Sequence, residues 1–267
     1  MYELPLYQID AFTSRLFGGN PAAVCPLKEW LPDNILQSIA AENNLSETAY
    51  FIPKGDDFEL RWFTPMFEID LCGHATLASA HVIFNHLNYK RDRIAFHSRQ
   101  HGTLYVTRKD DWLTLDFPAR PAEPCPLPAG ALEALGGPVP TECGLARDFI
   151  FVYENEEIIR NMKPDFGKLK EVRQDGKHRW AIITAPGTDC DFVSRFFCAG
   201  DGIDEDPVTG SAHCTLVPYW AKRLGKTSFF ARQISARGGE LRCELKGDRV
   251  FIAGQAVTYM QGQIFVP

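Results

Sequence analysis

The chain has 267 residues, of which 45% are hydrophobic and 23% are charged, and this composition is typical of a globular protein. Its formal net charge is -6, and because it contains no run of Lys or Arg, we expect no nucleic-acid partner. The N-terminus lacks the basic start and apolar core of a signal peptide, and no segment approaches the roughly 20 apolar residues of a membrane-spanning helix. We therefore expect a cytoplasmic protein with no membrane partner.

The first half of the chain alternates between strand and helix signals. The segment Gly18-Gly19-Asn20-Pro21 is a strong turn signal, and the run after it is expected to pair with the opening strand. Apolar residues at helical spacing predict helices over 31–43 and from about 74 to 86. Alternating apolar residues predict strands over 6–12, 22–25, 48–52 and 58–63, and further strands within 94–117.

Seven prolines between 118 and 140 disfavour regular structure and indicate a linker, with one short helix around 131–135. After this linker the second half begins again with a strand. A Gly- and Asp-rich loop then leads into a helix over about 211–224. The remaining predicted strands are 148–153, 180–184, 191–197, 240–246, 249–252 and 256–265.

Two segments of the chain echo each other. The first runs from Arg61-Trp62-Phe63 through an acidic loop to Gly73-His74-Ala75, and the second from Arg195-Phe196-Phe197 through an acidic loop to Gly210-Ser211-Ala212. Each is read as strand, loop, glycine and helix, which is a common combination and can arise by chance. Because both halves also open with a strand and devote several strands to one helix, gene duplication is the simpler account.

The repeated element is suited to holding an anion. The first N–H groups of a helix have no partner within it, and with the helix dipole they attract negative charge. Glycines such as Gly73 and Gly210 let a ligand approach the backbone closely. Two such helices would hold a carboxylate or a developing enolate. No phosphate-type glycine loop is present, so a nucleotide is not expected.

Two residues of the first half are candidates for proton transfer. Glu47 lies between a polar loop and an apolar strand, where partial desolvation suits a carboxylate to proton shuttling; the plain alternative is a surface carboxylate at a strand edge. His74 follows Gly73 at a helix start, where the dipole favours a neutral, hydrogen-bonding imidazole; its alternative role is helix capping. We interpret His81 as a packing residue.

In the second half, Asp206 precedes a rigid proline turn and Ser211 stands where a helix N-cap is expected, so capping alone would explain this serine. The sequence around it is not the G-x-S-x-G elbow of a serine nucleophile. The acidic loop also lacks the spacing of an EF-hand, and we expect no metal site.

Cys72 precedes the first glycine, and a thiol at a helix N-terminus can have a lowered pKa and act as a base. A racemase with two thiol bases would need a matching cysteine in the second half. Aligning Gly73 with Gly210 places Thr209 there, which disfavours that mechanism.

The cysteines form no recognisable pairs in the sequence. There are 8, and none belongs to a C-x-x-C motif or has the spacing of a zinc site. A chain of this length does not need disulfides for stability. We therefore interpret most of them as small buried apolar side chains.

Taken together, six segments resemble the phenazine biosynthesis-like (PhzF-like) isomerase family. They occur in family order and span most of the chain, and although each is weak alone, the ordered set is specific. The segments are Asp10-Ala11-Phe12-Thr13, Gly19-Asn20-Pro21-Ala22, Leu45-Ser46-Glu47-Thr48, Arg61-Trp62-Phe63-Thr64-Pro65, Cys72-Gly73-His74-Ala75-Thr76 and Glu205-Asp206-Pro207-Val208-Thr209-Gly210-Ser211-Ala212.

The resemblance implies the diaminopimelate-epimerase-like fold: an α/β (α+β) protein of two similar lobes, each an antiparallel, barrel-like sheet wrapped around a central helix. The lobes would be 1–117, with the final strand 256–267 crossing back, and 118–255. The active site would lie in the cleft between them, and family members usually form homodimers.

The resemblance further implies cofactor-independent proton transfer on a small carboxylate. Glu47 would be the general acid/base and His74, Asp206 and Ser211 would support it. We expect the substrate-binding residues to be Asn20, Gly73, Thr209 and Gly210. Two alternatives remain open: a small-molecule-binding protein without catalysis, and an enzyme that depends on Cys72.

Overall fold

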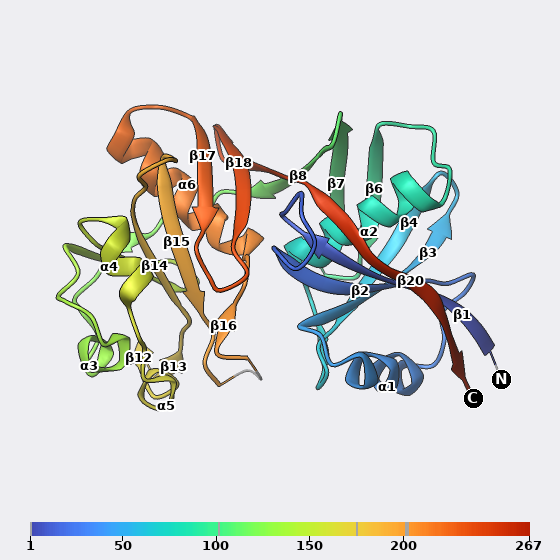
Figure 1. The fold of residues 1–267 in the computed structure, drawn as a ribbon, viewed down its shortest axis with the longest axis horizontal. Coiled ribbons are helices and arrows are strands. Elements are labelled where there is room, and N and C mark those ends of the chain that lie inside the picture. Colours follow the sequence, from blue (N-terminus) through green and yellow to red (C-terminus); the bar gives the residue numbers. More distant parts are fainter. Residues whose placement is uncertain (1, 101, 175, 201–202) are drawn as a thin grey trace. The chain divides into compact units, whose positions relative to one another are not determined.

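The computed structural model describes residues 2–100, 102–174, 176–200 and 203–267. Contacts within the chain divide it into two compact units (Figure 1). Unit 1 comprises Met1–Phe117 and Ile252–Pro267, and unit 2 comprises Pro118–Phe251. Among the described residues, no helix combines the length and the apolar character that crossing a membrane requires.

Unit 1 is a curved sheet that encloses one helix. Strand β1 pairs antiparallel with both β2 and the last strand, β20, while β2–β3 and β4–β6 are parallel pairs within the mainly antiparallel sheet. The elements are β1 (Tyr2–Ala11), β2 (Asn20–Pro26), α1 (Asp33–Asn43), β3 (Glu47–Lys54), β4 (Asp57–Phe63), β5 (Glu68–Ile69), α2 (Gly73–His86), β6 (Arg93–Ser98), β7 (Gly102–Lys109), β8 (Trp112–Pro118) and β20 (Ala256–Val266).

Helix α2 is the centre of unit 1, with strands on several sides (Figure 1). Every residue from Gly73 to Phe84 is buried, so the helix has no solvent-facing side over three turns. A helix that is buried all round forms only inside a core, where small residues such as Ala75 and Ala78 let the strands pack closely against it. The expected sheet wrapped around a central helix is therefore confirmed here.

Unit 2 repeats this plan around helix α6. Strand β11 pairs parallel with β14, and β15 pairs parallel with β17. Strand β14 pairs antiparallel with β15, and β17 pairs antiparallel with β18. The elements are β9 (Glu123–Pro124), α3 (Ala131–Leu135), β10 (Glu142–Leu145), β11 (Phe149–Val152), α4 (Glu156–Asn161), α5 (Phe166–Leu169), β12 (Arg173–Gln174), β13 (Lys177–His178), β14 (Ala181–Pro186), β15 (Phe192–Phe197), β16 (Glu205–Asp206), α6 (Gly210–Leu224), β17 (Ser228–Gln233), β18 (Gly239–Lys246) and β19 (Arg249–Gly254).

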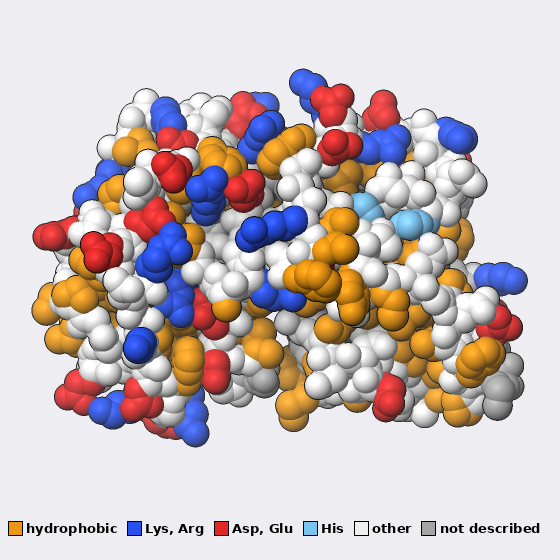
Figure 2. Space-filling view, viewed as in Figure 1, with side chains coloured by type: hydrophobic (Ala, Val, Ile, Leu, Met, Phe, Trp, Pro, Cys, Tyr) orange, Lys and Arg blue, Asp and Glu red, His pale blue; other side chains and the backbone are white. Residues whose placement is uncertain are grey.

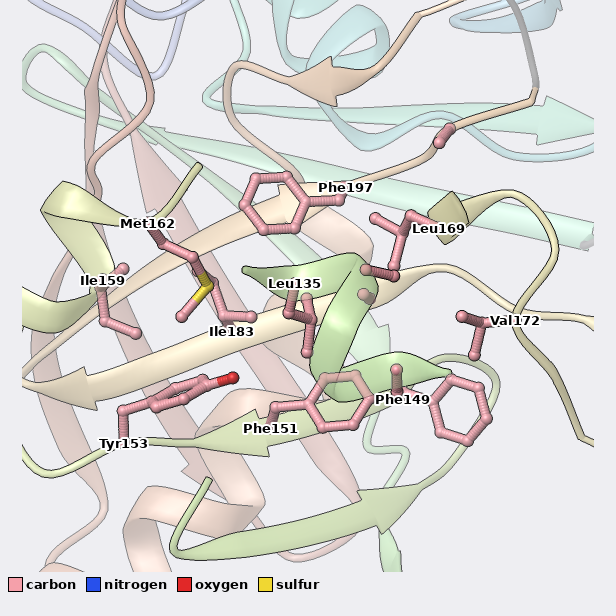
Figure 3. Close-up of a cluster of buried hydrophobic side chains, with 14 of the residues drawn as sticks. Leu135, Phe149, Phe151, Tyr153, Ile159, Met162, Leu169, Val172, Ile183 and Phe197 are labelled. Atoms are coloured by element: carbon pink, nitrogen blue, oxygen red, sulfur yellow. The ribbon is translucent and has the colours of Figure 1, made fainter. Parts of the chain in front are cut away.

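The sheet of unit 2 is covered on both faces. One face packs on the short helices α3, α4 and α5 through a cluster that includes Phe149, Phe151, Ile183 and Phe197 (Figure 3). On the other face, the ring of Phe192 stacks on Trp220 of α6 at a centroid distance of 5.6 Å. Strands buried on two faces have continuous rather than alternating apolar sequences, which is the pattern of β11 and β14.

On the face shown in Figure 2, hydrophobic side chains gather along unit 1, where β20 leaves several residues exposed. Tyr259 of β20 is 48% exposed, and its ring meets that of Phe17, which is 68% exposed, edge to face at 5.8 Å.

The predicted strands and the two central helices are present, with ends displaced by a few residues. The prediction missed α4, which begins where the Asn155 side chain accepts a hydrogen bond from the Ile158 N–H, and it missed β10 and β17. The proline-rich segment expected to be a linker carries β9 as well as the predicted α3.

Candidate functional site

Strand register brings the first site residues together in unit 1. Strands β2 and β3 run parallel with Ala22 opposite Glu47, so Asn20 and Glu47, which begin these two strands, lie at the same end of the pair. Helix α2 packs against both strands, and its first turn carries Cys72 and His74. The predicted residues Asn20, Glu47 and His74 therefore meet although they are distant in the sequence.

The turn before Asn20 can only be built with glycine at one position. Gly19 has φ of +62°, and a Cβ there would lie 2.1 Å from the backbone oxygen of Ala11. This close approach sets the path of the chain into β2 and so places the fully buried Asn20 against the helix. The Gly-Gly-Asn-Pro turn thus has a positioning role for the site.

His74 is the centre of the contacts in unit 1. Its Nε2 lies 3.1 Å from Oε2 of Glu47, and its Nδ1 lies 3.1 Å from Nδ2 of Asn20 and 3.5 Å from Sγ of Cys72. In a neutral ring, Nδ1 would accept from the Asn20 amide nitrogen and Nε2 would carry the proton that faces Glu47, whereas a charged ring donates from both nitrogens and needs the amide oxygen of Asn20 at Nδ1.

The contact between His74 and Glu47 is close but poorly directed. Their side chains are 5% and 16% exposed, and although Nε2 and Oε2 are at ion-pair distance, neither atom has a hydrogen bond of acceptable angle within the described residues. We regard the contact as electrostatic. Such pairs in catalytic sites are often long or misaligned before substrate binds.

The environment raises the pKa of His74 well above its ordinary value. Burial opposes protonation, but the neighbouring Cys72 sulfur and Glu47 carboxylate outweigh it. Burial raises the pKa of Cys72 itself to about 11, so this group keeps its proton near neutral pH. The expectation of a neutral His74 is therefore wrong in direction, because Cys72 and Glu47 lie beside the imidazole and favour its charged form.

Glu47, Cys72 and His74 together offer three ligand atoms within 4.8 Å of one another. Carboxylate, thiolate and imidazole are ligands that Zn²⁺ accepts. A metal would have to displace the proton of a thiol whose pKa is about 11 and compete with the ion pair of Glu47 and His74. These residues could thus hold a metal ion only at the expense of the pair formed by Glu47 and His74.

In unit 2, the loop before α6 is held by a network of hydrogen bonds. The hydroxyl of Thr209 donates to Oδ2 of Asp206 at 2.5 Å. The buried amide of Gln233 accepts from the Thr209 N–H at 2.9 Å and donates to the Asp206 carbonyl at 2.7 Å. Predicted Asp206, Thr209 and Gly210 are therefore adjacent, and Thr209 rather than Ser211 is the residue that precedes the helix.

Ser211 has a different environment from the one expected. It lies in the first turn of α6, so its role as N-cap was wrong, and its hydroxyl accepts a hydrogen bond from Arg147 at 3.1 Å. Arg147 also pairs with Asp148 at 2.7 Å and lies over the ring of Trp180. A guanidinium beside the first turn of a helix adds to its attraction for anions.

Sequence reasoning missed Gln233 and Arg147. Gln233 had a usable signal, since alternation along β17 places it on the buried side, where a polar side chain calls for a partner. Arg147 had none, because it stands in a loop where an arginine is unremarkable.

Comparison with known proteins shows the family of this chain. The family model for phenazine biosynthesis-like proteins matches residues 9–262. The chain belongs to this family. A Pseudomonas aeruginosa protein named an uncharacterized isomerase is 49% identical over 98% of this chain and 99% of its own length.

Solved structures place the fold. An Enterococcus faecalis protein of the PhzF family superposes with a TM-score of 0.95, at 45% identity, over 99% of this chain and 100% of that one. A hydroxyproline epimerase from Agrobacterium vitis has a TM-score of 0.62 at 11% identity, over 98% of this chain and 92% of that one. The epimerase-like fold is thus confirmed.

Proposed function

We propose that this protein is a cofactor-independent isomerase or epimerase that moves a proton on a small carboxylate substrate, with Glu47 as general acid/base. The observation that carries the proposal is the Glu47–His74 pair: a partly exposed carboxylate at 3.1 Å from a buried imidazole, beside the first turn of α2. Membership in a family with a relative named an isomerase supports the reaction class.

In the proposed reaction, Glu47 removes a proton from a carbon near the substrate carboxylate. The C–H bond breaks, an O–H bond forms on Glu47, and the electron pair moves into an enolate-like intermediate. When Glu47 returns the proton to another carbon, a double bond moves; inversion of a centre would need a second group to deliver a proton from the opposite face. N–H groups in the first turn of α2, which have no partner within the helix, would stabilise the negative charge that develops.

His74 would orient Glu47 and balance its charge, because Nε2 faces the carboxylate and Asn20 fixes the ring from its other side. Asp206 and Ser211 are proposed as supporting residues, and Asn20, Gly73, Thr209 and Gly210 as substrate contacts. The Thr209 and Gln233 hydrogen bonds support this role by holding the Asp206 loop in one arrangement.

The test is a screen of small unsaturated and amino carboxylates for hydrogen exchange in D₂O, followed by NMR. For a substrate found this way, Glu47→Gln is expected to slow solvent deuterium incorporation by roughly 10²–10⁴-fold while leaving ligand binding nearly intact. The matched control is Glu42→Gln, which changes an exposed glutamate on α1 and should leave the exchange rate unchanged.

An unchanged rate in Glu47→Gln, together with loss of activity in Cys72→Ala, would instead assign the chemistry to the thiol. The structure disfavours that outcome, since burial keeps Cys72 protonated near neutral pH. A ligand that binds wild-type protein without any proton exchange would show a binding protein rather than an isomerase.

A further inference from the structure

Two cysteines that are distant in the sequence lie side by side in unit 2. The Sγ atoms of Cys125 and Cys143 are 3.3 Å apart, although 18 positions separate the residues. Both side chains are partly exposed, whereas Cys25, Cys72, Cys198, Cys214 and Cys243 are buried. This juxtaposition has no role in the site described above.

The backbone fixes the pair in register. Strands β9 and β10 pair antiparallel with Pro124 opposite Gly144, so the next residues along, Cys125 and Cys143, face each other. The Cys125 N–H donates to the Cys143 carbonyl at 3.1 Å, which extends the pairing to these two residues. Both side chains also pack against the buried cluster that includes Phe149 and Phe151.

We propose that Cys125 and Cys143 form a reversible disulfide when the protein meets a hydroperoxide. An S–S bond measures about 2.05 Å, so the sulfurs need to approach by only about 1 Å, within the reach of a small change in side-chain torsions. The bridge would tie the segment before α3 to strand β10 and close a loop that contains α3.

The proposed oxidation proceeds in two nucleophilic attacks. The Cys125 thiolate attacks the O–O bond, which forms an S–O bond and releases hydroxide or the alkoxide. The Cys143 sulfur then attacks the sulfenic acid on Cys125, which forms the S–S bond and releases a second hydroxide. The two thiol protons neutralise the released anions, so two thiols are oxidised and one peroxide is reduced.

The same steps balance with the two cysteines exchanged, since each sulfur lies 3.3 Å from the other and both side chains are partly exposed. The proposal therefore does not depend on which sulfur attacks the peroxide first.

The test is to treat the native full chain with hydrogen peroxide, block free thiols and map the digest by mass spectrometry without reduction. We expect a peptide pair joined through Cys125 and Cys143, reversed by dithiothreitol, and a fall in free thiols from 8 by two. Irreversible sulfinic or sulfonic acid at these positions without a cross-link, or a cross-link to other cysteines, would overturn the proposal.

Variants separate the pair from general oxidation. Cys125→Ser and Cys143→Ser should each abolish the cross-link. The matched control is Cys190→Ser, because Cys190 is the remaining partly exposed cysteine and its loss should leave the cross-link intact. In wild-type protein, the oxidised form should unfold at a higher temperature than the reduced form, since the bridge restricts the unfolded chain.

Discussion

The two central helices begin with the same backbone plan and opposite electrostatics. In unit 1, His74 is buried beside a carboxylate and its pKa is raised. In unit 2, His213 is equally buried one turn into α6, but its Nδ1 donates to the backbone carbonyl of Thr209 at 2.9 Å and burial lowers its pKa to about 4. Burial lowers the pKa of both histidines, and only at His74 do neighbouring side chains reverse the direction of the shift.

What the two units share is a support behind each helix. Arg61 forms a two-bonded contact with Glu68, at 2.7 and 2.6 Å, and Arg195 forms the same contact with Glu205, at 2.7 and 2.8 Å. Each arginine also lies over the phenylalanine two positions further along its strand. The echo seen in the sequence therefore corresponds to a repeated structural device that fixes each acidic loop.

The largest expected effect tests whether these two arginine contacts are equivalent. Arg195→Met should lower the free energy of unfolding by about 3–4 kcal/mol. Arg195 also donates to the carbonyls of Ile159 and Met162, and these would lose their hydrogen-bond donor. Arg61→Met should cost less, about 2 kcal/mol, because its partners Asp33 and Glu68 are 69% and 32% exposed and can rehydrate.

Denaturant unfolding measures both variants. Arg160→Met is the control, since Arg160 is an exposed arginine of unit 2 paired within α4, and it should change stability by less than about 0.5 kcal/mol. Equal losses for Arg61→Met and Arg195→Met would show that the extra carbonyl contacts contribute nothing.

The second prediction concerns pH and the contrast between the histidines. The folded-state pKa values of His81 and His213 are lowered to about 4, below the unfolded value of about 6.5. Stability from these groups is present above pH 6.5 and is lost as pH falls toward 4. His213 alone should account for about 3 kcal/mol as an upper figure.

For His74 the sign is reversed. Its folded-state pKa is raised, so its contribution is complete below pH 6.5 and is lost as pH rises through the folded value. Unfolding measured from pH 4 to pH 9 should therefore show a flatter acid limb in His213→Asn and a flatter alkaline limb in His74→Gln. An acid limb that is unchanged in His213→Asn would contradict the assignment.

Local pattern predicted most of the fold and little of the site geometry. Apolar spacing along α2 and α6 predicted both central helices, and the Gly-Gly-Asn-Pro turn predicted the β1–β2 hairpin, which is present in the expected antiparallel register. Glu47 and His74 were each proposed from local context. Their contact depends on the parallel register of β2 and β3, and no local pattern encodes which strands become neighbours.

The third prediction tests the hydrogen-bond network in unit 2. Gln233 is fully buried and bonds to the loop at two points, so Gln233→Met removes the bonds but preserves the approximate volume. We expect a loss of about 2 kcal/mol in unfolding free energy, because the Thr209 N–H and the Asp206 carbonyl lose their partner. The exposed Gln261 of β20 offers the control, Gln261→Met, with no comparable loss.

If the network positions Asp206, then Gln233→Met should also lower the exchange activity proposed for this protein without changing the alkaline limb of stability set by His74. A variant that unfolds more easily but exchanges protons at the wild-type rate would reduce Gln233 to a purely structural role.

The smallest expected effect comes from making the two helix starts chemically alike. Thr209→Cys gives unit 2 a thiol at the position equivalent to Cys72. It should cost about 1 kcal/mol in unfolding free energy, since the hydroxyl donation to Asp206 is lost. It should not yield an enzyme with two thiol bases, because Cys72 has a pKa of about 11 and remains protonated near neutral pH.

The test is to add Cys72→Ala to wild type and to Thr209→Cys. Loss of exchange in the Thr209→Cys background, but not in wild type, would show that Cys72 acts as a base once the second thiol is present. Retention of exchange in both backgrounds would support the proposed role of the Glu47 carboxylate beside His74. In unit 2, Thr209 and Gln233 surround Asp206, and this is the difference between the two helix starts.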